Sequence, residues 1–199
     1  MRLLHTADWH LGRPLEGRSR LEEQAEVLDE IVRLAEEEAI DVVLLAGDVF
    51  DSVNPPAAAE QLFYESIARL AGKGRRPVAV IAGNHDNPDR LAAATPLAQE
   101  QGIVLLGYPV WHPLRIAVPS SGEVLCLAAL PYPSEARLNE LLSDSPQAHL
   151  LQEAYDGRVK QLFRQLAGDF SQQTVNVAMS HLFVAGGISS DSERPIEVG

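Results

Sequence analysis

Apolar runs and amphipathic stretches alternate through the first half of the chain. Three aliphatic runs, at residues 2–7, 40–45 and 78–82, have the length and composition of buried strands. Residues 20–38, between the first two runs, carry apolar side chains at the spacing of one helix face. That face comprises Leu21, Ala25, Leu28, Val32 and Ala35. Strands that alternate with helices in this way predict a parallel sheet covered by helices.

Two more helices are predicted in this part of the chain. The first covers residues 57–72, and Pro56 suits the first turn of a helix. The second covers residues 88–100 and starts near the Asn87-Pro88 pair. The alternation of strand and helix therefore continues up to about residue 100.

The pattern changes in the second half of the chain. Residues 103–132 contain short apolar runs separated by proline and glycine turns, which predicts a hairpin or a sheet edge. Residues 134–144 and 147–168 are predicted to form two helices, and residues 174–180 the last strand. We expect a single compact α/β domain over residues 1–199.

Composition narrows the class of protein. The net charge of −12 argues against a broad basic surface for nucleic acid, although bound divalent cations can change the field at a site in an acidic protein. Cys126 is the only cysteine, so neither an intrachain disulfide nor a thiolate zinc cage is possible. The apolar runs are shorter than a membrane span and no signal peptide precedes them, so we expect an unexported, cytoplasmic protein.

Polar residues gather where four predicted strands end. They are Asp8 and His10, Asp48 with Asp51, Asn84 with His85 and Asp86, and His181. Each alone could cap a turn, but ligands of α/β proteins collect outside the carboxyl ends of strands. Carboxylate, imidazole and amide donors without thiolate suit manganese, iron or zinc, and of these we expect Mn²⁺.

The order of these residues suggests individual roles. Asp8 and His10 lie two apart, so in extended backbone both would face one side. Asp48 is the natural bridge between two metal ions that clamp a phosphate. His85 could donate a proton to the leaving oxygen or, alternatively, only hydrogen-bond to a metal ligand. His112 and His149 stand alone and are expected to have structural or surface roles.

These motifs carry a family resemblance. Asp8-x-His10, Gly47-Asp48-x-x-Asp51, Gly83-Asn84-His85-Asp86 and a later His181 match the calcineurin-like metallophosphoesterases in order and spacing. The complete sequences of the segments at 8–12, 47–51 and 180–184 are similar to those of the SbcD-type nuclease subunits of bacteria. The resemblance implies a four-layer α-β-β-α sandwich. It also implies ATP-regulated DNA cleavage with an SbcC-type ATPase, as an exonuclease on double-strand ends and an endonuclease on single strands and hairpins.

The resemblance also implies roles for the site residues. Asp8, His10 and Asp48 would hold the first Mn²⁺, and Asp48, Asn84 and His181 would hold the second. His85 takes the place of the catalytic histidine. Asp51, where relatives often have histidine, would contact a ligand from outside the metal shell or face DNA. The helices at 57–72 and 88–100 are the expected homodimer contact.

One departure from the family pattern bears on this chain. The family supplies two more metal ligands in a downstream Gly-His-x-His motif, which does not occur before Gly199. The DNA-facing cap and the ATPase-binding region are also absent, so we expect an N-terminal fragment with incomplete metal sites. Two tightly bound Mn²⁺ per chain would contradict that expectation. The alternatives are a phosphoesterase for small molecules or phosphoproteins, and a non-catalytic dimerising module.

Overall fold

The first sheet is built from strands of the first half of the chain. The structure, a computed structural model, describes residues 1–143, Leu150 and residues 154–184. Within these residues the sheet has the order β1-β2-β3-β4, with every neighbouring pair parallel. Its strands are β1 (Leu3–Thr6), β2 (Val42–Ala46), β3 (Val78–Ile81) and β4 (Ile103–Leu106). The predicted parallel sheet is confirmed.

A second sheet has the order β5-β6-β7 among the described residues. β5 (Leu114–Val118) and β6 (Glu123–Leu130) form an antiparallel hairpin, and β7 (Val175–Ser180) lies parallel to β6. The hairpin predicted within residues 103–132 is therefore present, and β7 crosses over to pair with it.

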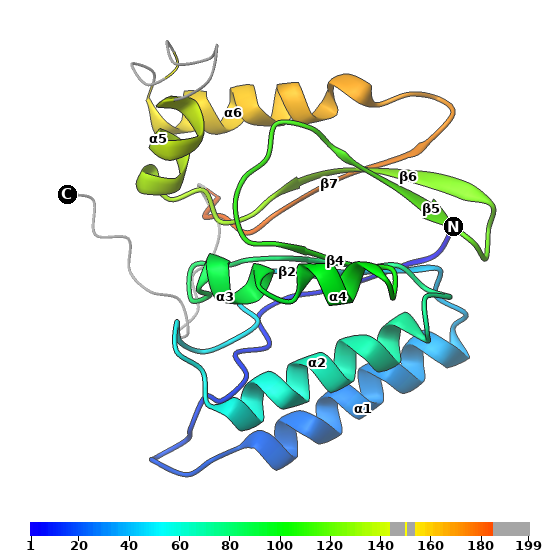
Figure 1. The fold of residues 1–199 in the computed structure, drawn as a ribbon, viewed down its shortest axis with the longest axis vertical. Helices are drawn as coiled ribbons and strands as arrows, with labels where there is room; N and C mark the ends of the chain where they lie inside the picture. The colour runs from blue at the N-terminus through cyan, green and yellow to red at the C-terminus, as the bar shows by residue number, and fades with distance from the viewer. Residues whose placement is uncertain (144–149, 151–153, 185–199) are drawn as a thin grey trace.

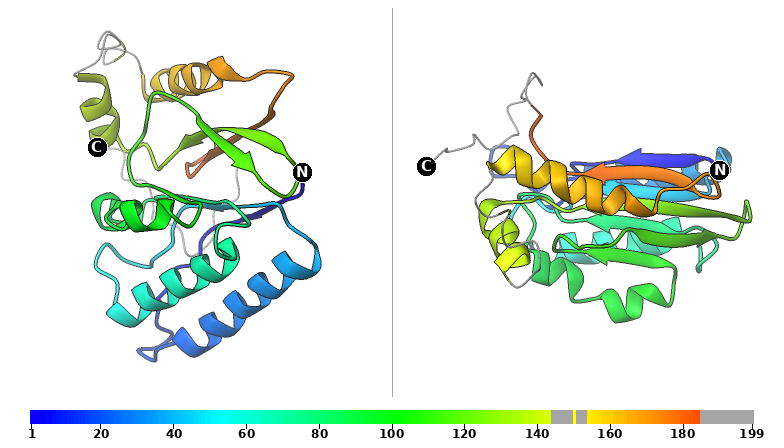
Figure 2. Two further views of the ribbon diagram at one scale, coloured as in Figure 1. Left: turned by 45° about the vertical axis from the view of Figure 1, so that its right-hand side comes forward. Right: turned by 90° about the horizontal axis from the view of Figure 1, so that it is seen from above.

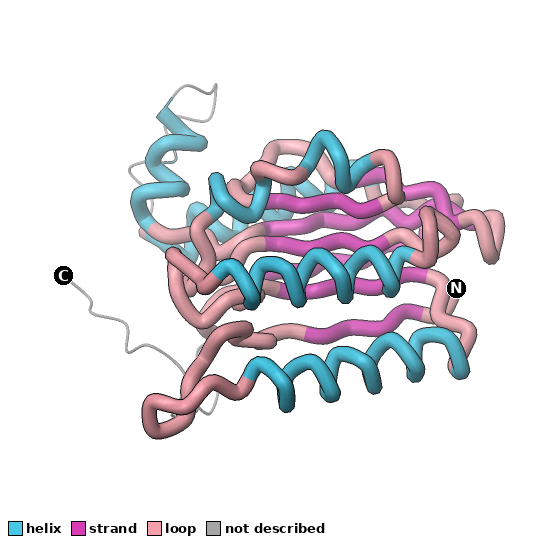
Figure 3. Tube along the Cα trace, turned by 60° about the horizontal axis from the view of Figure 1, so that its bottom comes forward, coloured by secondary structure: helices cyan, strands magenta, loops and turns pink. Residues whose placement is uncertain are grey.

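The two sheets lie face to face between two layers of helices (Figures 1 and 2). The first sheet is covered by α1 (Leu21–Glu37), α2 (Ala57–Ala71), α3 (Pro88–Ala92) and α4 (Thr95–Gln99), as Figure 3 shows. The second is covered by α5 (Glu135–Ser143) and α6 (Tyr155–Leu166). This is the predicted four-layer sandwich. Over the described ranges, no helix has the length and apolar character that crossing a membrane requires.

Strand β2 is packed on both of its faces, against helices on one side and against the second sheet on the other. All five of its residues are buried. Val43 and Leu45 pack in the cluster between the sheet and its helices. Val42, Leu44 and Ala46 pack in the cluster between the two sheets. Because both faces of the strand are covered, its sequence is a continuous apolar run rather than an alternation.

The single helix predicted at residues 88–100 is wrong. Two short helices, α3 and α4, occupy this segment, with a turn at residues 93–94 between them. Pro96 has no N–H to donate to the carbonyl of Ala92, so a continuous helix would lack a hydrogen bond there. The predicted start is correct, because the Asn87 side chain accepts the N–H of Arg90 at 3.1 Å.

The helix predicted at residues 147–168 is shorter in the described part of the chain. It runs from Tyr155 to Leu166 and continues as a 3₁₀ turn at Ala167–Asp169. Residues 147–149, including His149, and residues 151–153 lie outside the described residues.

Candidate metal centre

The polar residues predicted at four strand ends meet at one edge of the sandwich. Asp8 and His10 follow β1, Asp48 and Asp51 follow β2, Asn84 and His85 follow β3, and His181 follows β7. A cavity of about 390 Å³ opens among them. Its lining comprises Asp8, His10, Asp48, Asn84 and His181, together with His5, Ala7, Ala46, Ser180, Leu182 and Phe183. His85 and Asp51 adjoin this group through their contacts with Asp48 and His10.

Asp48 lies at the centre of the cluster and is only 3% exposed. Its Oδ2 lies 3.7 Å from Nε2 of His10 and 3.9 Å from Nε2 of His85. Nε2 of His181 lies 3.6 Å away from the same oxygen. These separations are too long for hydrogen bonds. They fit donors that share a cation, because two atoms each about 2.1 Å from one ion lie about 3–4 Å apart.

Asp8, His10 and Asp48 form one group that could hold a metal ion. Their donor atoms all lie within 4.8 Å of one another, and His10 Nε2 is 3.8 Å from Asp8 Oδ1. Burial lowers the pKa of His10, the neighbouring His85 lowers it further, and the carboxylate of Asp48 opposes both. His10 is therefore neutral near pH 7, which is the form that binds a metal.

Asp48, Asn84 and His181 form a second group. Nδ1 of His181 donates to the carbonyl of Ala46 at 2.8 Å, so Nε2 of the neutral ring is an acceptor. That nitrogen faces another acceptor, the side-chain oxygen of Asn84, at 2.9 Å. A metal ion between these two acceptors would satisfy both, and it fits this donor set.

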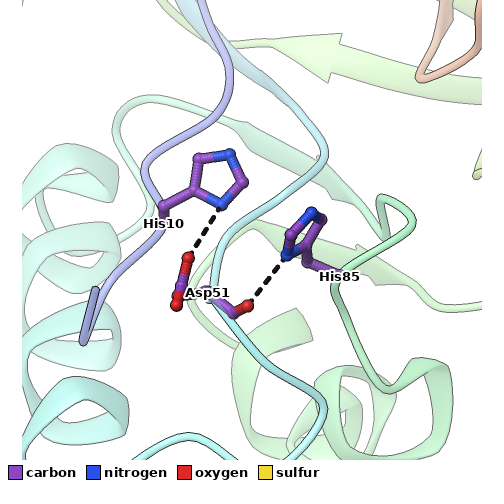
Figure 4. A group of neighbouring side chains, drawn as sticks. All are labelled: His10, Asp51 and His85. Carbon is purple, nitrogen blue, oxygen red and sulfur yellow. Dashed lines mark hydrogen bonds and ion pairs between the residues drawn. The ribbon is translucent and has the colours of Figure 1, made fainter. Parts of the chain in front are cut away.

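Asp51 connects His10 and His85, as Figure 4 shows. The backbone carbonyl of Asp51 accepts a hydrogen bond from Nδ1 of His85 at 2.8 Å. Its carboxylate lies 3.7 Å from Nδ1 of His10. Within the described residues, Nε2 of His85 has no hydrogen-bond partner and lies 3.9 Å from Asp48. The three residues also have donor atoms within 4.8 Å of one another, so they are a competing metal group.

The backbone of the site is left-handed, which corrects the extended geometry predicted at the first strand end. The φ angles of Asp8, His10 and Asp48 are 56°, 44° and 49°. Such conformations cost a non-glycine residue about 1–3 kcal/mol each and concentrate at functional sites. Hydrogen bonds between the two strand-end loops stabilise them, including Asp8 N–H to Gly47 O at 3.1 Å and His10 N–H to Asp48 O at 3.0 Å.

Two side chains outside the two candidate metal groups hold these loops. Gln24 of α1 accepts the N–H of Gly12 at 3.0 Å and donates to the carbonyl of His10 at 2.9 Å. Asp86, 1% exposed, accepts backbone N–H groups from residues 49, 50 and 83. The motif Gly83-Asn84-His85-Asp86 gave a signal for Asp86. No sequence signal distinguished Gln24, because it lies on a helix whose other polar residues face solvent.

Two glycines leave the space that the site side chains occupy. A Cβ on Gly83 would lie 2.0 Å from Oδ1 and 2.3 Å from the backbone N of Asp48. A Cβ on Gly47, whose φ is 91°, would lie 2.6 Å from the ring of His181. The close approach of the β2, β3 and β7 ends therefore requires glycine at both positions.

We expect Gly83→Ala to destabilise the folded protein by about 1–3 kcal/mol, the usual cost of overpacking. The midpoint of thermal unfolding, followed by circular dichroism, should fall by several degrees. Gly168→Ala is the matched control, because a Cβ there meets no heavy atom within 4 Å. Equal unfolding midpoints for the two variants would show that the approach at Gly83 is not tight.

Comparison with known proteins gives two results. The sequence profile of the calcineurin-like phosphoesterases matches residues 1–197, a range that contains every predicted site residue. The chain is 60% identical, over all of its 199 residues, to the SbcD subunit of the SbcCD nuclease of Bacillus subtilis (strain 168). It spans about half of that relative, 51% of its length.

Proposed function

Because this chain belongs to the calcineurin-like phosphoesterase family, we propose that residues 1–199 form the phosphodiesterase domain of a metal-dependent DNA nuclease. One observation carries the proposal. The buried Asp48 carboxylate has Nε2 of His10 at 3.7 Å and Nε2 of His181 at 3.6 Å, one from each proposed metal group, which suits an oxygen shared between metal ions. The name of the Bacillus subtilis relative, a nuclease subunit, supports the choice of nuclease among phosphoesterases.

The proposed cofactor is a pair of Mn²⁺ ions. Asp8, His10 and Asp48 would hold one, and Asp48, Asn84 and His181 the other. When bound, such ions lower the pKa of water and withdraw charge from phosphate oxygens. The carboxylate of Asp48 belongs to both groups, so its replacement should affect both ions.

His85 is the proposed proton donor to the leaving oxygen. Its Nδ1 proton is held by the Asp51 carbonyl at 2.8 Å, so His85 would donate from Nε2 in its doubly protonated, imidazolium form. That nitrogen is buried beside Asp48, where it has no competing hydrogen bond among the described residues. Asp51 thus holds His85 by its carbonyl, while its carboxylate lies 3.7 Å from Nδ1 of His10 without a hydrogen bond to it.

The proposed substrate is DNA, cut as an exonuclease at double-strand ends and as an endonuclease on single strands and hairpins. The proposed partner is an SbcC-type ATPase, in keeping with the name of the Bacillus subtilis relative. Arg13 and Arg20 line a second cavity that also contains Asp8 and His10. Arg20 is paired with Glu23 of the same cavity at 2.8 Å, so Arg13 is the cation proposed to meet a phosphate beside the site.

The nuclease proposal is tested with protein expressed from its complete reading frame. With Mn²⁺, it should cleave end-labelled duplex and hairpin DNA much faster than it hydrolyses p-nitrophenyl phosphate. Chelation should remove both activities. The opposite order of rates would favour the phosphoesterase for small molecules or phosphoproteins. Absence of both activities would favour the non-catalytic module.

A homodimer is proposed through α2, α3 and α4, which replace the two helices predicted from the sequence. A cavity of about 700 Å³ lies among these helices, with Tyr64, Ile67 and Leu97 in its lining. Leu97 of α4 is 75% exposed. An exposed leucine beside an apolar groove is unfavourable in water and suits contact with a second copy.

We expect Leu97→Asp to weaken dimerisation by about 100-fold or more. A symmetric interface buries each leucine twice, and burying one leucine contributes about 1.5–3 kcal/mol. Analytical ultracentrifugation measures the monomer–dimer constant. Val27→Asp is the control, because Val27 of α1 is also exposed, at 59%, but lies outside this groove. A wild-type monomer, or a dimer unaffected by Leu97→Asp, would contradict the proposed interface.

A further inference from the structure

Arg137 reaches from the second helix layer to the loop that carries Asn84 and His85. It lies on α5, and its Nη1 donates to the carbonyl of Tyr132 at 3.0 Å and to that of Gly83 at 3.5 Å. Its Nη2 donates to the carbonyl of Asp86 at 3.3 Å. One guanidinium therefore binds the backbone on both sides of the Asn84-His85 pair.

The surroundings of Arg137 indicate that its guanidinium binds backbone carbonyls and is not paired with a carboxylate. Its guanidinium carbon lies 5.8 Å from the centre of the Tyr132 ring, which shields it from water. Within the described ranges, Arg137 forms no ion pair with a carboxylate. Burial lowers the pKa of its guanidinium, and the charges of Asp86 and Asp89 oppose that shift. The planar fork of arginine donates from nitrogens set apart and meets acceptors at separate positions, whereas the three donors of a lysine ammonium all start from one nitrogen.

Two different side chains bind the loop of residues 83–86. The Asp86 side chain binds it to the end of β2 through N–H groups of Val49 and Phe50. Arg137 binds its carbonyls to α5 and to Tyr132, which follows the end of β6. The second contact matters for the site, because the proposed ligands Asn84 and His181 come from different sheets and their 2.9 Å separation depends on how the sheets are joined.

We propose that Arg137 is a positioning residue that sets the placement of Asn84 and His85. Through Asn84 it sets the affinity of the second metal position, and through His85 the rate of proton transfer. The inference rests on the proposed function, since it assigns a metal-binding role to Asn84.

The test compares Arg137→Ala and Arg137→Lys with the wild type, all expressed from the complete reading frame. Electron paramagnetic resonance of unbound Mn²⁺ measures affinity at a temperature where circular dichroism shows every variant folded. Arg137→Ala should weaken one of two Mn²⁺ sites by about 10- to 100-fold, the usual effect of removing a group that orients a ligand. DNA cleavage should lose kcat with KM unchanged, and Arg137→Lys should recover part of both losses.

Arg158→Ala is the matched structural control. Arg158 of α6 is 6% exposed and donates to Asn139 and Glu135 of α5, the helix that carries Arg137, rather than to the loop. This variant should unfold at a lower temperature while both Mn²⁺ affinities stay at the wild-type level.

Two outcomes would overturn the proposal while leaving the proposed function intact. In one, Arg137→Ala binds both ions as the wild type does. In the other, Arg158→Ala weakens Mn²⁺ binding as much as Arg137→Ala, which would reduce Arg137 to a general structural role. A wild-type protein that binds no Mn²⁺ and cleaves no DNA would instead overturn the proposed function and, with it, this inference.

Discussion

Replacing His85 by asparagine is expected to lower kcat for DNA cleavage by about 10²- to 10⁴-fold, the usual contribution of a positioned proton donor. Nδ1 of His85 is fixed by the Asp51 carbonyl, and Nε2 faces the cluster without a partner among the described residues. Asparagine keeps the backbone N–H that donates to Asp48 at 2.9 Å but cannot carry the proton. Mn²⁺ affinity should therefore change little.

The leaving group provides the decisive comparison for His85. With bis-p-nitrophenyl phosphate, whose leaving group departs without a proton, His85→Asn should lose far less rate than with DNA. His112→Asn, at an exposed histidine far from the site in sequence, is the control and should behave as the wild type. Equal losses on both substrates would assign His85 to positioning rather than proton donation.

Replacing Asp48 by asparagine is expected to remove both Mn²⁺ ions and to leave no measurable DNA cleavage. Asparagine has nearly the same shape and can still accept the His85 N–H, but it has lost the negative charge that two cations would share. Wild-type protein should gain about 2.7 kcal/mol of unfolding free energy for each ion whose Kd is about 100-fold below the free Mn²⁺ concentration. The Asp48→Asn variant should gain almost none, which thermal unfolding with and without Mn²⁺ measures.

Asp51→Asn is the matched control for Asp48→Asn. Asp51 is three residues further along the same loop, and its carboxylate lies 3.7 Å from Nδ1 of His10 and belongs to neither proposed metal group. Its replacement should cost about 10- to 100-fold in activity or metal affinity, as for other groups that orient a ligand. If both variants lose Mn²⁺ equally, the assignment of Asp48 as the shared ligand is wrong.

The strand ends that form the site could be predicted from sequence, because each is marked by residues that are adjacent in the chain. Apolar runs that stop at Gly47 and Gly83, followed at once by polar residues, indicate where parallel strands end. All such ends in a parallel sheet meet at one edge, so Asp48 and Asn84 were expected near each other. The structure also brings in His181, although it follows a strand of the other sheet.

Other features depend on contacts between distant segments and could not be predicted. Asp8 and His10 adopt left-handed backbone because their N–H groups bind the β2 loop, which no spacing rule reveals. Gln24 and Arg137 lie on amphipathic helices, where a polar residue is ordinarily exposed to solvent. Only the packed structure shows that each binds the backbone of a strand-end loop.

The central claim is that the strand-end cluster is a two-metal site bridged by Asp48. Anomalous X-ray diffraction from Mn²⁺-soaked crystals of the protein from its complete reading frame tests it most directly. We predict two manganese peaks, both bonded to Asp48, one beside Asp8 and His10 and the other beside Asn84 and His181. The absence of bound manganese, or one peak among His10, Asp51 and His85 instead, would contradict the account.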